Sequence, residues 1–170
     1  MTGLDFSSIA IERAKGLGLD CQVADLDAGI PFDNSTFDTV WAGDVIEHLF
    51  DPVFVLKEVN RVLVPGGLLL CTIPYDLRLT TRLRILLGHS YQEITYKELG
   101  QYKHHTFFSI PLLKYMLKKS SLQLQEIKYV IKFPKLKREF ISTNRALVYF
   151  AKTMAVRAVS KNSYKINNSK

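Results

Sequence analysis

A run of six mainly apolar residues, Leu68 to Ile73, constrains the fold of this 170-residue chain more than any other feature. The run follows the turn sequence Pro65-Gly66-Gly67 and stops at Pro74. A short apolar run between turn signals is typical of a central strand that helices cover on both faces. Such strands belong to sheets with helical crossovers, so the run favours an α/β architecture.

The residues before this run alternate strand patterns with helix patterns. Periodicity and turn residues predict short strands at residues 1–4, 20–24 and 36–42. They also predict two helices. The first covers residues 9–17, is capped by Ser7 or Ser8 and turns Ile9, Ile11 and Ala14 inward; the second runs from Asp51 or Pro52 to Leu63. This alternation predicts a doubly wound, mainly parallel sheet.

The pattern changes after Pro74. Residues 75–106 interleave leucine and arginine in an irregular helical pattern, which is typical of a lid or substrate insertion. We then expect a helix from Ser109 or Pro111 to Lys119, and an antiparallel closing pair of strands at residues 122–133 and 146–152. The chain should therefore form one domain, residues 1–152, followed by a basic and frayed tail at residues 153–170.

Composition agrees with an ordinary folded domain, because 47% of the residues are hydrophobic and 23% are charged. No apolar run approaches the roughly 20 residues of a membrane span, and no signal-peptide pattern is present. The expected location is cytoplasmic.

The charge is unevenly distributed along the chain. Residues 1–60 have a net charge of −8 and residues 61–170 a net charge of +15. An acidic half suits a cationic cofactor, and a basic half suits an anionic substrate, a phosphate-bearing carrier or an anionic membrane surface. The alternative is that the lysines only form solvated faces.

Several short motifs between residues 24 and 74 carry a family resemblance. They are Ala24-Asp25-Leu26-Asp27, Ile30-Pro31-Phe32, Phe37-Asp38-Thr39-Val40, Gly43-Asp44-Val45-Ile46-Glu47-His48-Leu49 and Leu63-Val64-Pro65-Gly66-Gly67. At these spacings the chain closely resembles a class I S-adenosylmethionine (SAM) dependent methyltransferase of type 11. The resemblance implies a Rossmann-like fold and SAM as cofactor. Residues 1–7 resemble the end of that family's second strand, so we expect its first strand and glycine-rich loop to be missing from this chain.

The expected cofactor site lies at the ends of successive strands. An acidic residue that ends a second strand is placed to accept both hydroxyls of a ribose, in NAD and SAM enzymes alike. By resemblance Asp5 holds the SAM ribose and Phe6 lies against the adenine. Asp25, with Leu26 beside it, matches the position that accepts the adenine amino group. A neighbouring acid, Asp27, is expected to be solvated.

The methionine end of SAM carries an ammonium and a sulfonium. Ala42, Gly43 and Asp44 end the next strand, and the resemblance implies that they face this end of the cofactor. A carboxylate or backbone carbonyls suit its positive charge.

Catalytic residues are expected in the run Asp44-x-x-Glu47-His48, and the family resemblance implies that His104, from the second half of the chain, returns to the same pocket. Two carboxylates and two histidines can bind a divalent metal, and this motif resembles metal-using groups among ubiquinone-pathway catechol and small-RNA methyltransferases. Many type 11 members carry Glu-His-Leu without a known metal. We therefore expect no metal, with His48 and His104 as general base or hydrogen-bonding partners of the substrate.

The favoured function is SAM-dependent methyl transfer to a small-molecule or lipid-linked acceptor, with oxygen as the expected atom and an anionic substrate suited to the basic half. One alternative is an RNA-modifying enzyme that stacks bases on aromatic residues. The candidate residues for stacking are Tyr91, Tyr96, Tyr102, Phe107 and Phe108. Because their spacings are typical of a protein core, nucleic acid is not the expected partner. Another alternative is a noncatalytic fragment. A NAD-dependent dehydrogenase is weaker still, since nothing resembles its catalytic residues.

The basic, leucine-rich segment 77–88 is expected to shape the acceptor pocket. It resembles the interfacial insertion of quinone-pathway relatives, which implies peripheral membrane contact. The alternative is that its leucines pack on the sheet.

Overall fold

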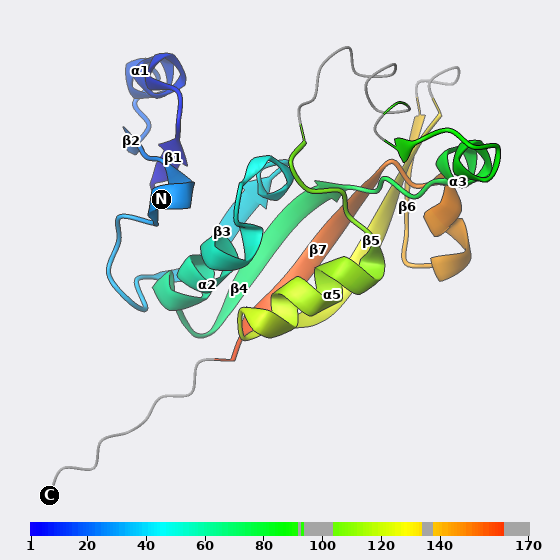
Figure 1. Cartoon of the computed structure of the whole chain (residues 1–170). Helices are drawn as coiled ribbons and strands as arrows, with labels where there is room; N and C mark the ends of the chain where they lie inside the picture. Colours follow the sequence, from blue (N-terminus) through cyan, green and yellow to red (C-terminus); the bar gives the residue numbers. More distant parts are fainter. Residues whose placement is uncertain (92, 94–103, 134–137, 162–170) are drawn as a thin grey trace, which may run out of the picture.

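The computed structural model describes residues 1–91, 93, 104–133 and 138–161. Its N-terminal part is a small unit of β1 (Gly3–Asp5), α1 (Ser8–Gly16) and β2 (Cys21–Val23), in that order along the chain (Figure 1). The two strands pair in parallel and form a sheet of their own. The predicted strand–helix–strand order is thus confirmed.

Helix α1 begins where the sequence predicts, because the Ser7 side chain accepts a hydrogen bond from the Ala10 N–H at 3.3 Å. Ile11 is buried, but Ile9 is 62% exposed, so the prediction that Ile9 turns inward is wrong. The two short strands contact only one narrow side of the helix. Ile11 lies on that side, beside Cys21, and Ile9 does not.

The main sheet has the strand order β3 (Phe37–Gly43), β4 (Leu63–Pro74), β7 (Thr153–Ser160), β5 (Leu122–Phe133) and β6 (Arg138–Ser142). Strands β3 and β4 are parallel, and the other three pairs are antiparallel. The predicted α/β class is confirmed, with parallel pairing before residue 75 and antiparallel pairing after it.

Helices α2 (Pro52–Val62) and α5 (Ile110–Lys119) lie side by side on one face of this sheet (Figure 1). Both start where predicted: the Asp51 side chain accepts from the Phe54 N–H, and the Ser109 side chain accepts from the Leu112 N–H. The core under them comes from alternate residues of the central strands and from the inner helix faces, namely Leu69, Cys71, Ile73, Met154, Val156, Ala158, Val55, Leu56, Val59, Leu113 and Leu117.

The opposite face of the sheet is more open in the part of the chain that the structure describes. Burial alternates along β4, where Leu69 is fully buried and Leu68 and Leu70 are partly exposed, and Trp41 on β3 is 66% exposed. The sequence predicts helices on both faces of β4, but among the described residues the face that carries Leu68 and Leu70 is only partly covered.

Two predictions for the C-terminal part are also wrong. The expected strand at residues 146–152 is mainly a 3-10 helix, η4 (Arg145–Phe150), which the Asn144 side chain caps through the Ala146 N–H at 2.9 Å. The expected tail from residue 153 contains β7, which lies between β4 and β5. Its sequence alternates with period two, and the inward residues Met154 and Ala158 are fully buried. Residues 162–170 lie outside the described residues.

The expected lid contains one helix that the structure describes in full, α3 (Leu79–Leu86). The alternative for segment 77–88, that its leucines pack on the sheet, holds in part. Leu77 packs against the core, whereas Leu83 is 50% exposed and Leu86 is 81% exposed. The lid residues 92 and 94–103 lie outside the described residues. None of the described helices is long and apolar enough to cross a bilayer.

Candidate functional site

The end of β3 carries a strained residue. Asp44 has a φ of 52°, in the left-handed region that residues other than glycine rarely adopt. Its N–H donates to the Thr72 hydroxyl at 3.1 Å, and that hydroxyl donates to Asp44 Oδ1 at 3.0 Å. Thr72 of the neighbouring strand β4 therefore holds Asp44 at the carboxyl end of β3.

The short helix η2 (Ile46–His48) follows, and its Glu47 is almost completely buried, at 1% exposure. The Glu47 carbonyl accepts the N–H groups of His105 and Thr106 at 2.8 and 3.1 Å. This pair of bonds joins the segment that carries His104 to η2.

The Glu47 side chain is the least satisfied polar group of the site. Its Oε2 has no hydrogen-bond partner in the part of the chain that the structure describes. Burial raises the pKa of Glu47; its own backbone N–H and the charge of His48 oppose this, while Asp44 and Asp76 add to it. A buried, unsatisfied carboxyl is a common mark of a functional site.

His48 and His104 come together as the sequence predicts. Their ring centroids are 5.0 Å apart in an edge-to-face arrangement, and His48 Nε2 lies 4.0 Å from Glu47 Oε1. Burial lowers the pKa of His104, and the neighbouring His48 lowers it further, against the opposite effect of Asp76 and Asp44. The neutral imidazole is thereby favoured.

One oxygen or nitrogen from each of Glu47, His48 and His104 lies within 4.8 Å of the others, so these are the described residues that could hold a metal ion. A bound ion with bonds of about 2.1 Å keeps its ligand atoms no more than about 4.2 Å apart, so the side chains would have to move closer. Asp44 and the sulfur of Cys71 do not belong to this group. Burial raises the pKa of Cys71 to about 12, with Glu47 adding to the effect, so its thiol stays protonated.

Asp76 is a residue of this site that sequence reasoning missed. Its Oδ2 accepts the Phe108 N–H at 2.9 Å, and burial raises its pKa against the opposing effects of Phe108, Tyr91, His104 and Arg78. Its position in the sequence could have predicted this role, because Asp76 follows the carboxyl end of β4 as Asp44 follows that of β3. Parallel neighbours end at the same sheet edge.

The other predicted cofactor residues lie in the β1–β2 unit. Asp5 ends β1, and its carbonyl accepts the Ala24 N–H at 3.0 Å, which places Asp5 beside the residue that precedes Asp25. Both acids are exposed, and each also accepts a local backbone N–H, from Ser7 and from Asp27 respectively. Phe6 is 76% exposed, whereas Leu26 is partly buried against the core.

Asp27 connects the two parts of the candidate site. It lies in η1 (Leu26–Ala28), and its carboxylate accepts the N–H groups of Phe50 and Asp51 at 3.1 to 3.3 Å. The prediction that Asp27 is solvated is therefore wrong. The side chain joins the segment after β2 to the segment that follows His48.

The structure describes three of the five aromatic residues that could stack on RNA bases. Phe108 is fully buried, and the rings of Tyr91 and Phe107 contact each other with centroids 4.4 Å apart. Tyr96 and Tyr102 lie outside the described residues.

Comparison with known proteins identifies the N-terminal part. Residues 1–71 match the family described as "Methyltransferase domain". The chain is 43% identical over 75 residues to a ubiquinone/menaquinone biosynthesis C-methyltransferase of Desulfotalea psychrophila, and 40% identical over 74 residues to a demethylmenaquinone methyltransferase of Staphylococcus carnosus. These matches cover 42% and 41% of this chain, and 30% of each relative's length.

Solved structures extend the likeness in fold to nearly the whole chain. A SAM-dependent methyltransferase of Thermotoga maritima, described as a possible histamine N-methyltransferase, aligns with a TM-score of 0.71 and 22% identity over 95% of this chain and 72% of its own. A putative methyltransferase of Haloferax volcanii, solved with the activator Trm112, aligns with a TM-score of 0.68 and 20% identity over the same shares. Residues 1–71 therefore match a methyltransferase domain family, and nearly the whole chain has the fold of solved SAM-dependent methyltransferases.

Proposed function

We propose that this chain takes part in methyl transfer from SAM to a small aromatic acceptor that carries a hydroxyl group. The observation that carries the proposal is the cluster of Glu47, His48 and His104 beside the carboxyl end of β3. Relatives named for quinone biosynthesis support an acceptor of this class.

The residues present fit the cofactor. Asp5, at the end of β1, and Asp25, after β2, offer exposed carboxylates for the ribose hydroxyls and the adenine amino group, with Phe6 and Leu26 as their neighbours in the sequence. Ala42, Gly43 and Asp44 would meet the methionine end. When bound, SAM supplies an electrophilic methyl group.

The two histidines would prepare the acceptor. We propose that His48 or His104 takes the proton of the acceptor hydroxyl, because a neutral imidazole can accept it and the pKa of His104 lies below its ordinary value. The resulting phenolate is nucleophilic at oxygen and at the neighbouring ring carbons. The same step therefore serves transfer to oxygen, which we expected from the sequence, and transfer to carbon, which the Desulfotalea relative's name records.

Asp76 and the Glu47 carbonyl would position His104. Asp76 binds Phe108, and Glu47 binds His105 and Thr106, so bonds on both sides hold the segment 104–108. Alignment of the reacting groups is the main protein contribution to a displacement reaction of this kind.

A basic apolar surface supports contact with a lipid-linked substrate. Leu83, Leu86 and Leu87 of the segment 77–88 are 50 to 81% exposed, and the same segment carries three arginines and no acidic residue. Apolar side chains among arginines suit the surface of an anionic membrane. Sedimentation with vesicles tests this: binding should require anionic lipid and should weaken in a Leu86→Ser, Leu87→Ser variant.

The experiment that tests the function uses SAM with an isotopically labelled methyl group and 1,4-dihydroxynaphthalene as acceptor. We expect the label in the product, and mass spectrometry would assign it to oxygen or to a ring carbon. Binding of SAM without transfer to any phenolic acceptor would contradict the proposal and favour the noncatalytic alternative.

A further inference from the structure

We infer that the rings of Phe50 and His105 form a stacking platform that binds the aromatic ring of the acceptor, an inference that rests on the proposed function. The two ring centroids are 4.4 Å apart and the ring planes differ by 31°. Phe50 is 78% exposed, although it is a large apolar side chain. A nearly parallel pair of rings with an exposed member presents a flat surface on which another planar ring can stack.

Both rings stand on backbone that hydrogen bonds hold in place. The Phe50 N–H donates to both oxygens of Asp27, at 3.1 and 3.3 Å. The His105 N–H donates to the Glu47 carbonyl at 2.8 Å. Because these bonds come from other elements, the platform exists before the ligand arrives, and little ordering is needed on binding.

The platform lies next to the proposed acceptor-activating residues. His105 directly follows His104, and Phe50 is two residues beyond His48. The Glu47 carbonyl that binds His105 belongs to the same residue whose side chain forms the cluster with both histidines. An aromatic ring on this surface would lie beside the two imidazoles.

These features select the chemical class of the ligand. A planar aromatic ring can stack on the outer face of the Phe50–His105 pair, whereas a saturated ring of the same size gains only from apolar contact. The exposed edge of the site therefore favours phenols and hydroquinones over aliphatic alcohols.

Binding of 2-naphthol to the isolated chain, followed by calorimetry and by amide chemical shifts, tests the inference. The saturated analogue 2-decalol is the ligand control. We expect 2-naphthol to bind about fivefold or more tightly than 2-decalol, with shifts at Phe50 and at residues 104–106. Phe50→Leu and His105→Leu should each weaken 2-naphthol binding by about fivefold and leave 2-decalol binding nearly unchanged.

Phe140→Leu is the matched control variant, because Phe140 is 52% exposed on β6 and takes no part in the platform. It should bind both ligands like the wild type. Equal affinity for the two ligands, or equal losses in Phe50→Leu and Phe140→Leu, would overturn the platform. So would the absence of 2-naphthol binding at millimolar concentration. The labelled-methyl assay separates the two ideas. Transfer to a phenolic acceptor that is unchanged in Phe50→Leu and in His105→Leu would keep the function and remove the platform, and binding of 2-naphthol without any methyl transfer would do the reverse.

Discussion

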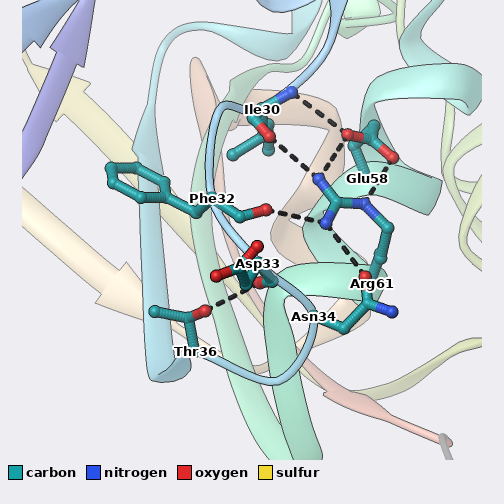
Figure 2. Close-up of polar contacts among 7 residues, drawn as sticks. All are labelled: Ile30, Phe32, Asp33, Asn34, Thr36, Glu58 and Arg61. Carbon is teal, nitrogen blue, oxygen red and sulfur yellow. Dashed lines mark hydrogen bonds and ion pairs between the residues drawn. The ribbon is translucent and has the colours of Figure 1, made fainter.

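Arg61 binds the carboxylate of Glu58 through two hydrogen bonds, from Nε to Oε1 at 2.8 Å and from Nη2 to Oε2 at 2.7 Å (Figure 2). The same guanidinium donates to the carbonyls of Ile30 and Phe32 at 2.8 and 2.7 Å, and Glu58 Oε2 accepts the Ile30 N–H at 3.1 Å. This ion pair on α2 therefore fixes the loop that joins η1 to β3. The predicted cofactor residues Asp25 and Leu26 lie at the start of that loop, and Ala42, Gly43 and Asp44 lie at the far end of the strand that follows it.

Replacing Arg61 with lysine should destabilise the fold. Lysine keeps the charge but cannot make the paired bonds to Glu58 and also reach the two carbonyls. We expect a loss of about 1 to 2 kcal/mol in the free energy of unfolding, since the side chain is only partly exposed and several bonds are lost. Urea unfolding measures it. Arg157→Lys, at an exposed position on β7, is the control, and a loss no larger than that of the control would contradict the role of Arg61.

The stability of the fold should fall at acid pH through Glu58. The Arg61 guanidinium lowers the pKa of Glu58, against a smaller opposing effect of burial. The folded state therefore binds this proton less readily than the unfolded state. Its stabilisation is present above the unfolded value of 4.5 and is lost as the pH falls through the lower folded pKa.

A Glu58→Gln variant isolates this effect. Its melting temperature should lie below that of the wild type at pH 7, and the difference should shrink as the pH falls below about 4. A difference that stays constant down to pH 2 would show that the charge of Glu58 is not the cause.

Binding of SAM should depend on Asp5 and Asp25. Asp5→Asn and Asp25→Asn should each weaken binding by about tenfold, because a charged acceptor of hydroxyl or amino groups is replaced by a neutral one. Trp41, the single tryptophan of the chain, lies on β3 near Gly43 and can report binding by fluorescence. Asp20→Asn, an exposed acid before β2, is the control. Unchanged affinity in both site variants would move the cofactor site elsewhere.

Methyl transfer should require a histidine and no added metal. We expect His48→Ala to reduce turnover by about 10² to 10⁴, the usual contribution of a positioned base, and activity to survive a chelator. His89→Ala, an exposed histidine that pairs with Glu93, is the control. If a chelator removes the activity and a divalent ion restores it, Glu47, His48 and His104 bind a metal ion instead. If both His48→Ala and His104→Ala keep full activity, the protein acts only by aligning the acceptor with the methyl group.

Asp76 should act through the position of His104. Asp76→Ala removes the acceptor of the Phe108 N–H and should reduce turnover by about tenfold while leaving SAM affinity unchanged. Asp76→Asn keeps an oxygen acceptor and should recover most of the loss. If Asp76→Asn and Asp76→Ala are equally impaired, the charge of Asp76 matters more than its bond to Phe108.

The sequence by itself determined the local elements and their caps. Helices α2 and α5 begin at Pro52 and Ile110 as expected, because Asp51 and Ser109 cap them and their apolar residues repeat with the helical period. The same holds for β3 and for the centre of β4. The meeting of His48 with His104, across 56 positions, was available only through the family resemblance.

Only the tertiary structure decided which distant segments meet. The sequence predicts a tail at residues 153–170 because basic and polar residues gather towards the end of this segment. Pairing with both β4 and β5 nevertheless buries the alternate residues of β7. Asp27 and Asp76 likewise look solvated in sequence. Their partners, Phe50 and Phe108, lie 23 and 32 residues away. A local sequence pattern predicts the structure of its own segment. The hydrogen bonds of these two carboxylates join segments that are distant in the sequence, so they form only when the chain folds back on itself, and a local pattern cannot predict them.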